Sequence, residues 1–269
     1  ADFIANQGGG IVNGYGAITD IIGTFVGNSI ISGGTSNTYN ESVAFGSAIY
    51  NSVYKSFIDN ITGVFSENKV IAKDNCAPSG NRMEGTAAGG AIYNGGTINS
   101  ITDSFFYNNH AEAESGKAQG GAIYNTYSPG YQTSGGIISK IQNTSFIGNY
   151  AKADSTNYFA LGGAIYTSSN MTFLADNKSI EFTGNYTEDS RGKIPNAIYV
   201  DIISTSSPTI TLTAQNNGTI TFNDQIDGGK PSGTTINRSN QYNLSLTGDK
   251  TGKITLNNDV INANITSEN

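Results

Sequence analysis

The sequence contains very few residues that could hold a metal ion or form a disulfide. Its 269 residues include one cysteine (Cys76), one histidine (His110) and no tryptophan. A single thiol cannot form an internal disulfide or a multi-thiolate metal site. A Ser-His-Asp triad would have to use His110, and no Gly-x-Ser-x-Gly nucleophile elbow accompanies it. We therefore expect a chain without metal, cofactor or catalysis.

Charged residues and long apolar runs are also scarce. Charged residues make up 13% of the chain, and 14 Lys and Arg against 21 Asp and Glu give a net charge of −7. Nucleic-acid binding depends on cationic side chains that neutralise phosphates, so this balance argues against it. The sequence has no Gly-x-x-x-x-Gly-Lys-Ser/Thr phosphate loop and no apolar run of about 18 residues that would cross a membrane as a helix.

Leucine is rare, whereas isoleucine is abundant. The chain has 6 Leu and 32 Ile. Isoleucine is branched at Cβ and suits strands, while leucine is a better helix former. Together with 34 Gly and few charges, this composition predicts an ordered all-β protein with a thin apolar core.

Two short motifs alternate along residues 1–200. Gly-Gly-Ala-Ile-Tyr-Asn occurs intact at 89–94 and 120–125, and variants begin near residues 8, 46, 162 and 196. Between them runs Phe-x-x-Asn, whose phenylalanines from Phe25 to Phe182 are 40, 41, 40 and 36 residues apart. Residues 201–269 carry a second repeat with an offset of 34, in which 218–223 corresponds to 252–257.

A repeat of this length with short strands and Gly or Asn turns is typical of stacked β architectures. We predict a right-handed parallel β-helix that forms a single unit over 1–269. A repeat of about 40 residues fits two rungs of about 20 residues each, which gives roughly 12–13 rungs. A β-propeller is the main alternative, because its blades have a similar length. The chain has neither a regular set of hairpin turns nor a Trp-Asp or kelch pattern, and this favours the β-helix.

The repeated residues have structural roles in this prediction. Isoleucines of the first motif should line the core: Ile11, Ile49, Ile92, Ile123, Ile165 and Ile198. Phenylalanines of the second motif should stack beside them: Phe25, Phe65, Phe106, Phe146 and Phe182. The asparagines three positions later should bond the backbone or one another where each strand turns: Asn28, Asn68, Asn109, Asn149 and Asn185.

Candidate contact residues come from the tyrosines and from insertions. Each tyrosine of the first motif follows its isoleucine, so strand alternation predicts a surface row that includes Tyr93 and Tyr124. Insertions in repeat arrays often form the binding face. Loops 73–88 and 126–136 are the candidates, because they carry the side chains of Arg82, Met83, Tyr127 and Tyr131.

These paired motifs, such as 106–109 followed by 120–123, resemble the passenger repeats of chlamydial polymorphic outer-membrane proteins. More broadly they are similar to autotransporter (type V secreted) passengers of Gram-negative bacteria. The resemblance implies export, display on the bacterial cell surface and outer membrane, and adhesion. It also implies membrane attachment through a C-terminal barrel domain, which this fragment lacks.

Three functions follow from these observations. The first is a surface adhesin that binds a host protein or glycan through its flank and loops. The second is self-association, in which a second copy binds through rows of Asn, Ser and Thr. The third is a β-helical polysaccharide-processing enzyme, which the scattered acidic residues do not favour.

Overall fold

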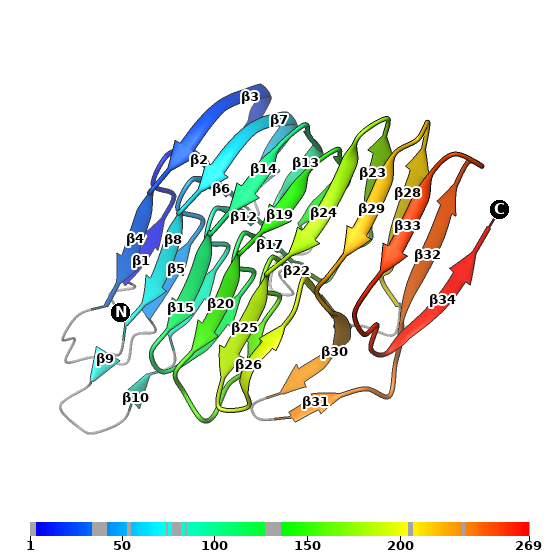
Figure 1. Cartoon of the computed structure of the whole chain (residues 1–269). Coiled ribbons are helices and arrows are strands. Elements are labelled where there is room, and N and C mark those ends of the chain that lie inside the picture. Colours follow the sequence, from blue (N-terminus) through cyan, green and yellow to red (C-terminus); the bar gives the residue numbers. More distant parts are fainter. Residues whose placement is uncertain are drawn as a thin grey trace.

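The structure is a computed structural model that describes residues 4–33, 42–52, 55–73, 75–76, 82–83, 85–126, 136–203, 207–232 and 235–268. These residues form β-strands joined by turns, and strands of successive turns stack side by side along one axis (Figure 1). This β-solenoid-like arrangement agrees with the predicted all-β class. Within the described ranges, no helix is long and apolar enough to cross a membrane.

Four stacked sheets, A to D, carry the chain around the turns up to about residue 200, and sheets B and C continue beyond them. Sheet A is parallel and short-stranded, and it was not expected. It contains β1 (Ile4–Gln7), β5 (Ser42–Phe45), β11 (Thr86–Ala88), β16 (Lys117–Gln119) and β21 (Ala160–Leu161). Strand β11 lies at the end of the predicted loop 73–88, which therefore contains regular structure as well as an insertion.

Sheet B holds the Ile-Tyr-Asn triplets in register. It contains β2 (Ile11–Asn13), β6 (Ile49–Asn51), β12 (Ile92–Asn94), β17 (Ile123–Asn125), β22 (Ile165–Thr167), β27 (Ile198–Asp201), β30 (Ile226–Ser232) and β31 (Thr235–Asn237). The first glycine of each Gly-Gly pair precedes a sheet B strand and has positive φ, such as +68° at Gly89. Glycine is favoured there because other residues are strained in that conformation.

Sheet C is the longest sheet. It contains β3 (Ala17–Val26), β7 (Phe57–Ser66), β13 (Thr97–Thr102), β14 (Phe105–Tyr107), β18 (Ile137–Gln142), β19 (Ser145–Ile147), β23 (Met171–Asp176), β24 (Ser179–Thr183), β28 (Thr209–Gln215), β29 (Thr219–Phe222), β32 (Tyr242–Gly248), β33 (Lys253–Leu256) and β34 (Ala263–Ser267). The tail continues the stack, because β28 pairs with β23 in parallel.

Sheet D completes each turn. It contains β4 (Ser29–Ser32), β8 (Lys69–Ala72), β15 (His110–Ala113), β20 (Tyr150–Ala153), β25 (Tyr186–Asp189) and β26 (Gly192–Pro195). A separate hairpin joins β9 (Asn75–Cys76) to β10 (Arg82–Met83). Strand β26 departs from the stack, since it runs antiparallel to β25.

The pairing register shows that one repeat makes one turn. Thr97 of β13 pairs with Phe57 of β7 on one side and with Ile137 of β18 on the other, an offset of 40 residues each time. The prediction of two 20-residue rungs per repeat, and hence of 12–13 rungs, is wrong. Sheet A and the two consecutive strands that each turn contributes to sheet C lengthen the circuit, and neither was visible as a periodic signal.

The predicted core residues are confirmed. The isoleucines from Ile49 to Ile198 are fully buried between sheets B and C, while Ile11 is partly buried at the first turn. The repeated phenylalanines stack face to face, with 4.7 Å between the ring centroids of Phe65 and Phe106. A second, thinner core of mostly alanines lies between sheets A and D.

The repeated asparagines form a buried hydrogen-bonded ladder. Asn109 Nδ2 donates to Asn149 Oδ1 at 2.9 Å and to the Phe65 carbonyl at 2.8 Å. Its own Oδ1 accepts from the backbone N–H and the side-chain amide of Asn68. Asp224 ends the ladder, because its carboxylate accepts from the backbone and side chain of Asn185. The predicted turn role of these asparagines is therefore confirmed.

We expect Asn109→Ala to destabilise the protein by about 3 kcal/mol or more, since it removes these bonds and leaves buried partners unpaired. Denaturant unfolding followed by circular dichroism measures the change. Asn99→Ala is the matched control: Asn99 makes an exposed bond to Asp59, and we expect a change within about 0.5 kcal/mol. Equal losses in both variants would show that the ladder has no special role.

Candidate functional site at the outer corner

The tyrosines of sheet B form a stacked ladder that lies in the outer corner between sheets A and B. Ring centroids are 5.2 Å apart between Tyr93 and Tyr124, and 5.2 Å between Tyr124 and Tyr166. Tyr93 is only 9% exposed and Tyr124 is half-buried. The predicted surface row is therefore wrong. These rings do point away from the main core, but residues of sheet A such as Phe45 and Ala88 fold across the corner and cover them.

The other predicted contact residues do not join this corner. Arg82 and Met83 form β10, which pairs with β9, and only this backbone pairing is described. Tyr127 and Tyr131 lie outside the described residues. Loops 73–88 and 126–136 therefore remain predictions as contact surfaces.

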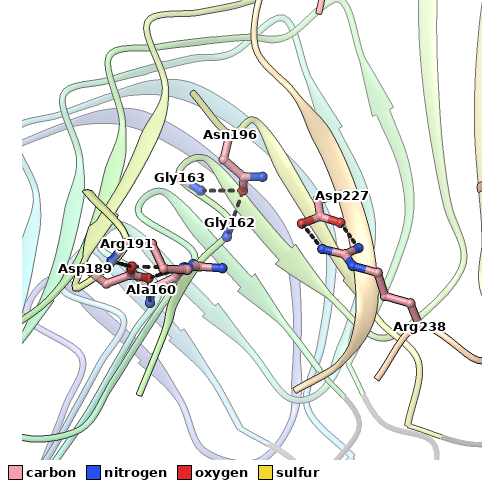
Figure 2. A network of polar contacts seen from close by, with 8 residues as sticks. All are labelled: Ala160, Gly162, Gly163, Asp189, Arg191, Asn196, Asp227 and Arg238. Carbon is pink, nitrogen blue, oxygen red and sulfur yellow. Dashed lines mark hydrogen bonds and ion pairs between the residues drawn. The ribbon is translucent and has the colours of Figure 1, made fainter. Parts of the chain in front are cut away.

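Sheet A ends at β21, and a set of side chains caps its last strand (Figure 2). Asp189 accepts from the Ala160 N–H at 2.9 Å, and Arg191 donates to the Ala160 carbonyl at 3.3 Å. Arg191 also forms a two-pronged ion pair with Asp189. Asn196 Oδ1 accepts from the N–H of Gly162 at 3.1 Å. An open sheet edge is thereby satisfied without another strand.

A second ion pair lies on the other side of Asn196. Arg238 contacts both carboxylate oxygens of Asp227, with 3.0 Å between Nη2 and Oδ2 (Figure 2). Between the two ion pairs lies a cavity of about 30 Å³. Its lining comprises Ala160, Leu161, Thr187, Arg191, Ile194, Asn196, Tyr199, Gln225 and Asp227. This volume equals about one water molecule.

Asp201 lies beyond the ladder, on the same face of β27 as Tyr199. The Tyr166 hydroxyl donates to its Oδ2 at 2.5 Å, whereas its Oδ1 is buried without a hydrogen-bond partner. Burial raises the pKa of Asp201 to about 6, although the bond from Tyr166 and the charges of Lys230 and Lys117 lower it in part. In this corner the carboxylates of Asp189, Asp201 and Asp227 are thus each held by a donor.

An outward aromatic row does exist, but on sheet D. His110, Tyr150 and Tyr186 stack with centroids 4.7 and 5.0 Å apart. Lys193 Nζ lies 3.5 Å from the centroid of Tyr186, and the Tyr150 hydroxyl donates to Glu112 at 2.7 Å. Because the ring faces cover one another, only their edges reach solvent. The sequence does not reveal this row as a repeat, because its members are a histidine and two tyrosines and not one residue type.

The outer face of sheet C carries a patch of exposed apolar side chains near the N-terminal end. We call it the sheet C patch, and it consists of Ile22, Val26, Val64, Phe105 and Tyr107, which are 76%, 57%, 41%, 37% and 41% exposed. These residues belong to three adjacent strands, β3, β7 and β14, and Val64 pairs directly with Phe105. Exposed apolar side chains gathered on neighbouring strands make this patch a candidate interaction site.

The buried carboxylate of Asp201 makes stability depend on pH. Its folded pKa of about 6 lies above the ordinary value of 3.8 that it has in the unfolded chain. The free energy of unfolding is therefore highest below pH 3.8 and falls as pH rises through 6. The loss amounts to about 3 kcal/mol. We expect Asp201→Asn to stabilise the protein at pH 7 and to flatten the unfolding free energy between pH 4 and 7.

Tyr166→Phe provides the complementary variant in the same denaturant titrations. It removes the bond that lowers the pKa of Asp201, so the midpoint of the pH dependence should move above that of the wild type. An unchanged pH profile in Asp201→Asn would contradict the assignment.

Comparison with known proteins finds no match for this chain. No protein-family model matches the chain, and neither a curated protein nor a solved structure matches it.

Proposed function

We propose that the chain is an exported adhesin passenger, a right-handed β-helical rod displayed on a bacterial cell surface, which binds a host-cell protein or glycan without catalysis. The observation that carries this proposal is the sheet C patch. It places five apolar side chains on neighbouring, paired strands of sheet C. Such residues gain little from facing water, and a partner that covers them gains apolar burial.

The rigidity of this face supports binding. Phe65 of β7 and Phe106 of β14 belong to the strands that carry the patch, and their stacked rings are fully buried on the inner face. The backbone under the patch is therefore held in place, and a partner meets it without ordering a loop. Several copies of a rod on one cell would convert weak single contacts into firm attachment through avidity.

Export and handedness have independent physical support. Each turn contacts its neighbours, so the rod could fold progressively as it leaves the cell. The single cysteine avoids internal disulfides that would hinder the passage of an unfolded chain. Parallel strands joined by crossovers are right-handed in nearly all known cases, which supports the same hand for this coil.

Self-association is the second candidate, with the sheet C patch as its contact surface. The polar rows that were expected to join two copies bond within the chain instead, as between the hydroxyls of Thr62 and Thr102 at 3.0 Å. Asn257 likewise donates to Asn223 at 2.7 Å. Their bonding capacity is thus partly used, which leaves the apolar patch as the stronger surface for a second copy.

We expect the double variant Phe105→Ser and Tyr107→Ser to reduce attachment to host cells at least tenfold, because it removes both aromatic rings of the patch. Flow cytometry with labelled protein measures attachment, and circular dichroism verifies the fold. Ile265→Ser is the matched control, since Ile265 is 51% exposed on the same sheet but outside the patch.

Sedimentation of the same three proteins separates the two candidates. A wild-type monomer whose cell binding is lost only in the double variant supports adhesion to the host. A concentration-dependent dimer that dissociates in the double variant, with no cell binding, supports self-association. Unchanged behaviour in both assays would contradict a role for the patch.

A further inference from the structure

The cavity at the outer corner is lined by polar side chains, and some of their donors and acceptors make no hydrogen bond to the end of sheet A. Asn196 Oδ1 is occupied by the N–H groups of Gly162 and Gly163, which fixes the orientation of the amide. Its Nδ2 therefore remains as a donor on the opposite branch of the side chain, as Figure 2 shows. Asn196 and Asp227 are 4% and 8% exposed, so these groups are held in place and do not move freely in solvent.

Tyr199 adds a buried hydroxyl without a partner. Its side chain lines the cavity and is 1% exposed, and its hydroxyl has no hydrogen-bond partner. A buried hydroxyl that lacks a partner costs about 1–3 kcal/mol, so native proteins rarely leave one unsatisfied. The hydroxyl thus marks a place where a polar group from outside the chain would be stabilised.

The charges around the cavity cancel. Arg191 is paired with Asp189, and Arg238 is paired with Asp227. An incoming anion or cation would find no net opposite charge and would lose its hydration. A neutral group that both donates and accepts can bond the Asn196 amide, the Tyr199 hydroxyl and the Asp227 carboxylate together.

We propose that this cavity binds one hydroxyl group of a neutral sugar chain, while the sugar ring rests outside against Arg191 and Ile194. The volume of about 30 Å³ admits a single hydroxyl group and excludes a whole ring. Arg191 is the exposed residue of the lining and Ile194 is half-buried, so these two form the rim. The other face of β26 carries Lys193 and Pro195, which pair with Glu188 and Tyr186 away from the cavity. The ligand class is therefore a neutral oligosaccharide that protrudes from a surface.

This inference rests on the proposed adhesin function in one respect, because it names a glycan as one of its receptors. It uses a different surface from the sheet C patch. Loss of cell attachment in the patch variants and loss of sugar binding in the cavity variants can therefore be scored separately.

The test uses the whole chain and a panel of neutral oligosaccharides built from glucose, galactose, mannose and N-acetylglucosamine. Saturation-transfer NMR identifies the sugars that bind, and titration calorimetry gives their affinity. We expect Tyr199→Phe to weaken binding at least tenfold while the stacked ring and the fold are kept. Tyr93→Phe is the matched control, because Tyr93 belongs to the same ladder but does not line the cavity.

The outcomes are distinct. Saturable binding that is lost in Tyr199→Phe and kept in Tyr93→Phe supports the site, as does the absence of any gain with sialylated or sulfated sugars. Failure of every neutral sugar to bind the wild type, or equal weakening in both variants, would overturn it and would leave the cavity as a site for water only.

Discussion

The structure depends on hydrogen bonds that pair every buried amide side chain of the asparagine ladder. Asn109 lies in an interior where water cannot bond it, and its partners are the equivalent asparagines one turn before and one turn after. An asparagine in one turn therefore requires a matching residue in the next. A neighbouring ladder follows the same rule, because Asn51 donates to Asn94 and Asn94 to Asn125. These chains of bonds hold the turns in one register. The phenylalanines and isoleucines of successive turns therefore stack on their equivalents in the next turn.

Stacking also determines which groups remain for partners. Aromatic rings in the tyrosine ladder and in the sheet D row cover one another, so their faces cannot bind a sugar. The polar rows of sheet C bond among themselves. What is left is the apolar side chains of the sheet C patch and the place where the repetition stops. Such places arise where a repeat position departs from its usual residue.

The end of sheet A is the clearest such departure. The segment after β25 turns back as β26 and does not add another parallel strand, so β21 needs side-chain partners for its backbone. Asp189, Arg191 and Asn196 supply them, and Pro195-Asn196 stands where earlier repeats have the Gly-Gly pair. The cap of β21 follows from this single interruption, and the cavity lies beside it.

Sequence alone determined the β class, the parallel stacking and the identity of the core, because Ile, Phe and Asn recur at a constant spacing that only stacked turns explain. It predicted the residues of the Asn28 to Asn185 ladder for the same reason. Only the tertiary structure decided how many residues make one turn, since sheet A has no periodic motif. It also decided whether Tyr93 and Tyr124 are buried. Strand alternation sets the side of the strand on which each ring lies, whereas burial depends on which residues pack over that side. The corner cavity likewise joins residues of five strands, β21, β25, β26, β27 and β30, between positions 160 and 227 of the chain.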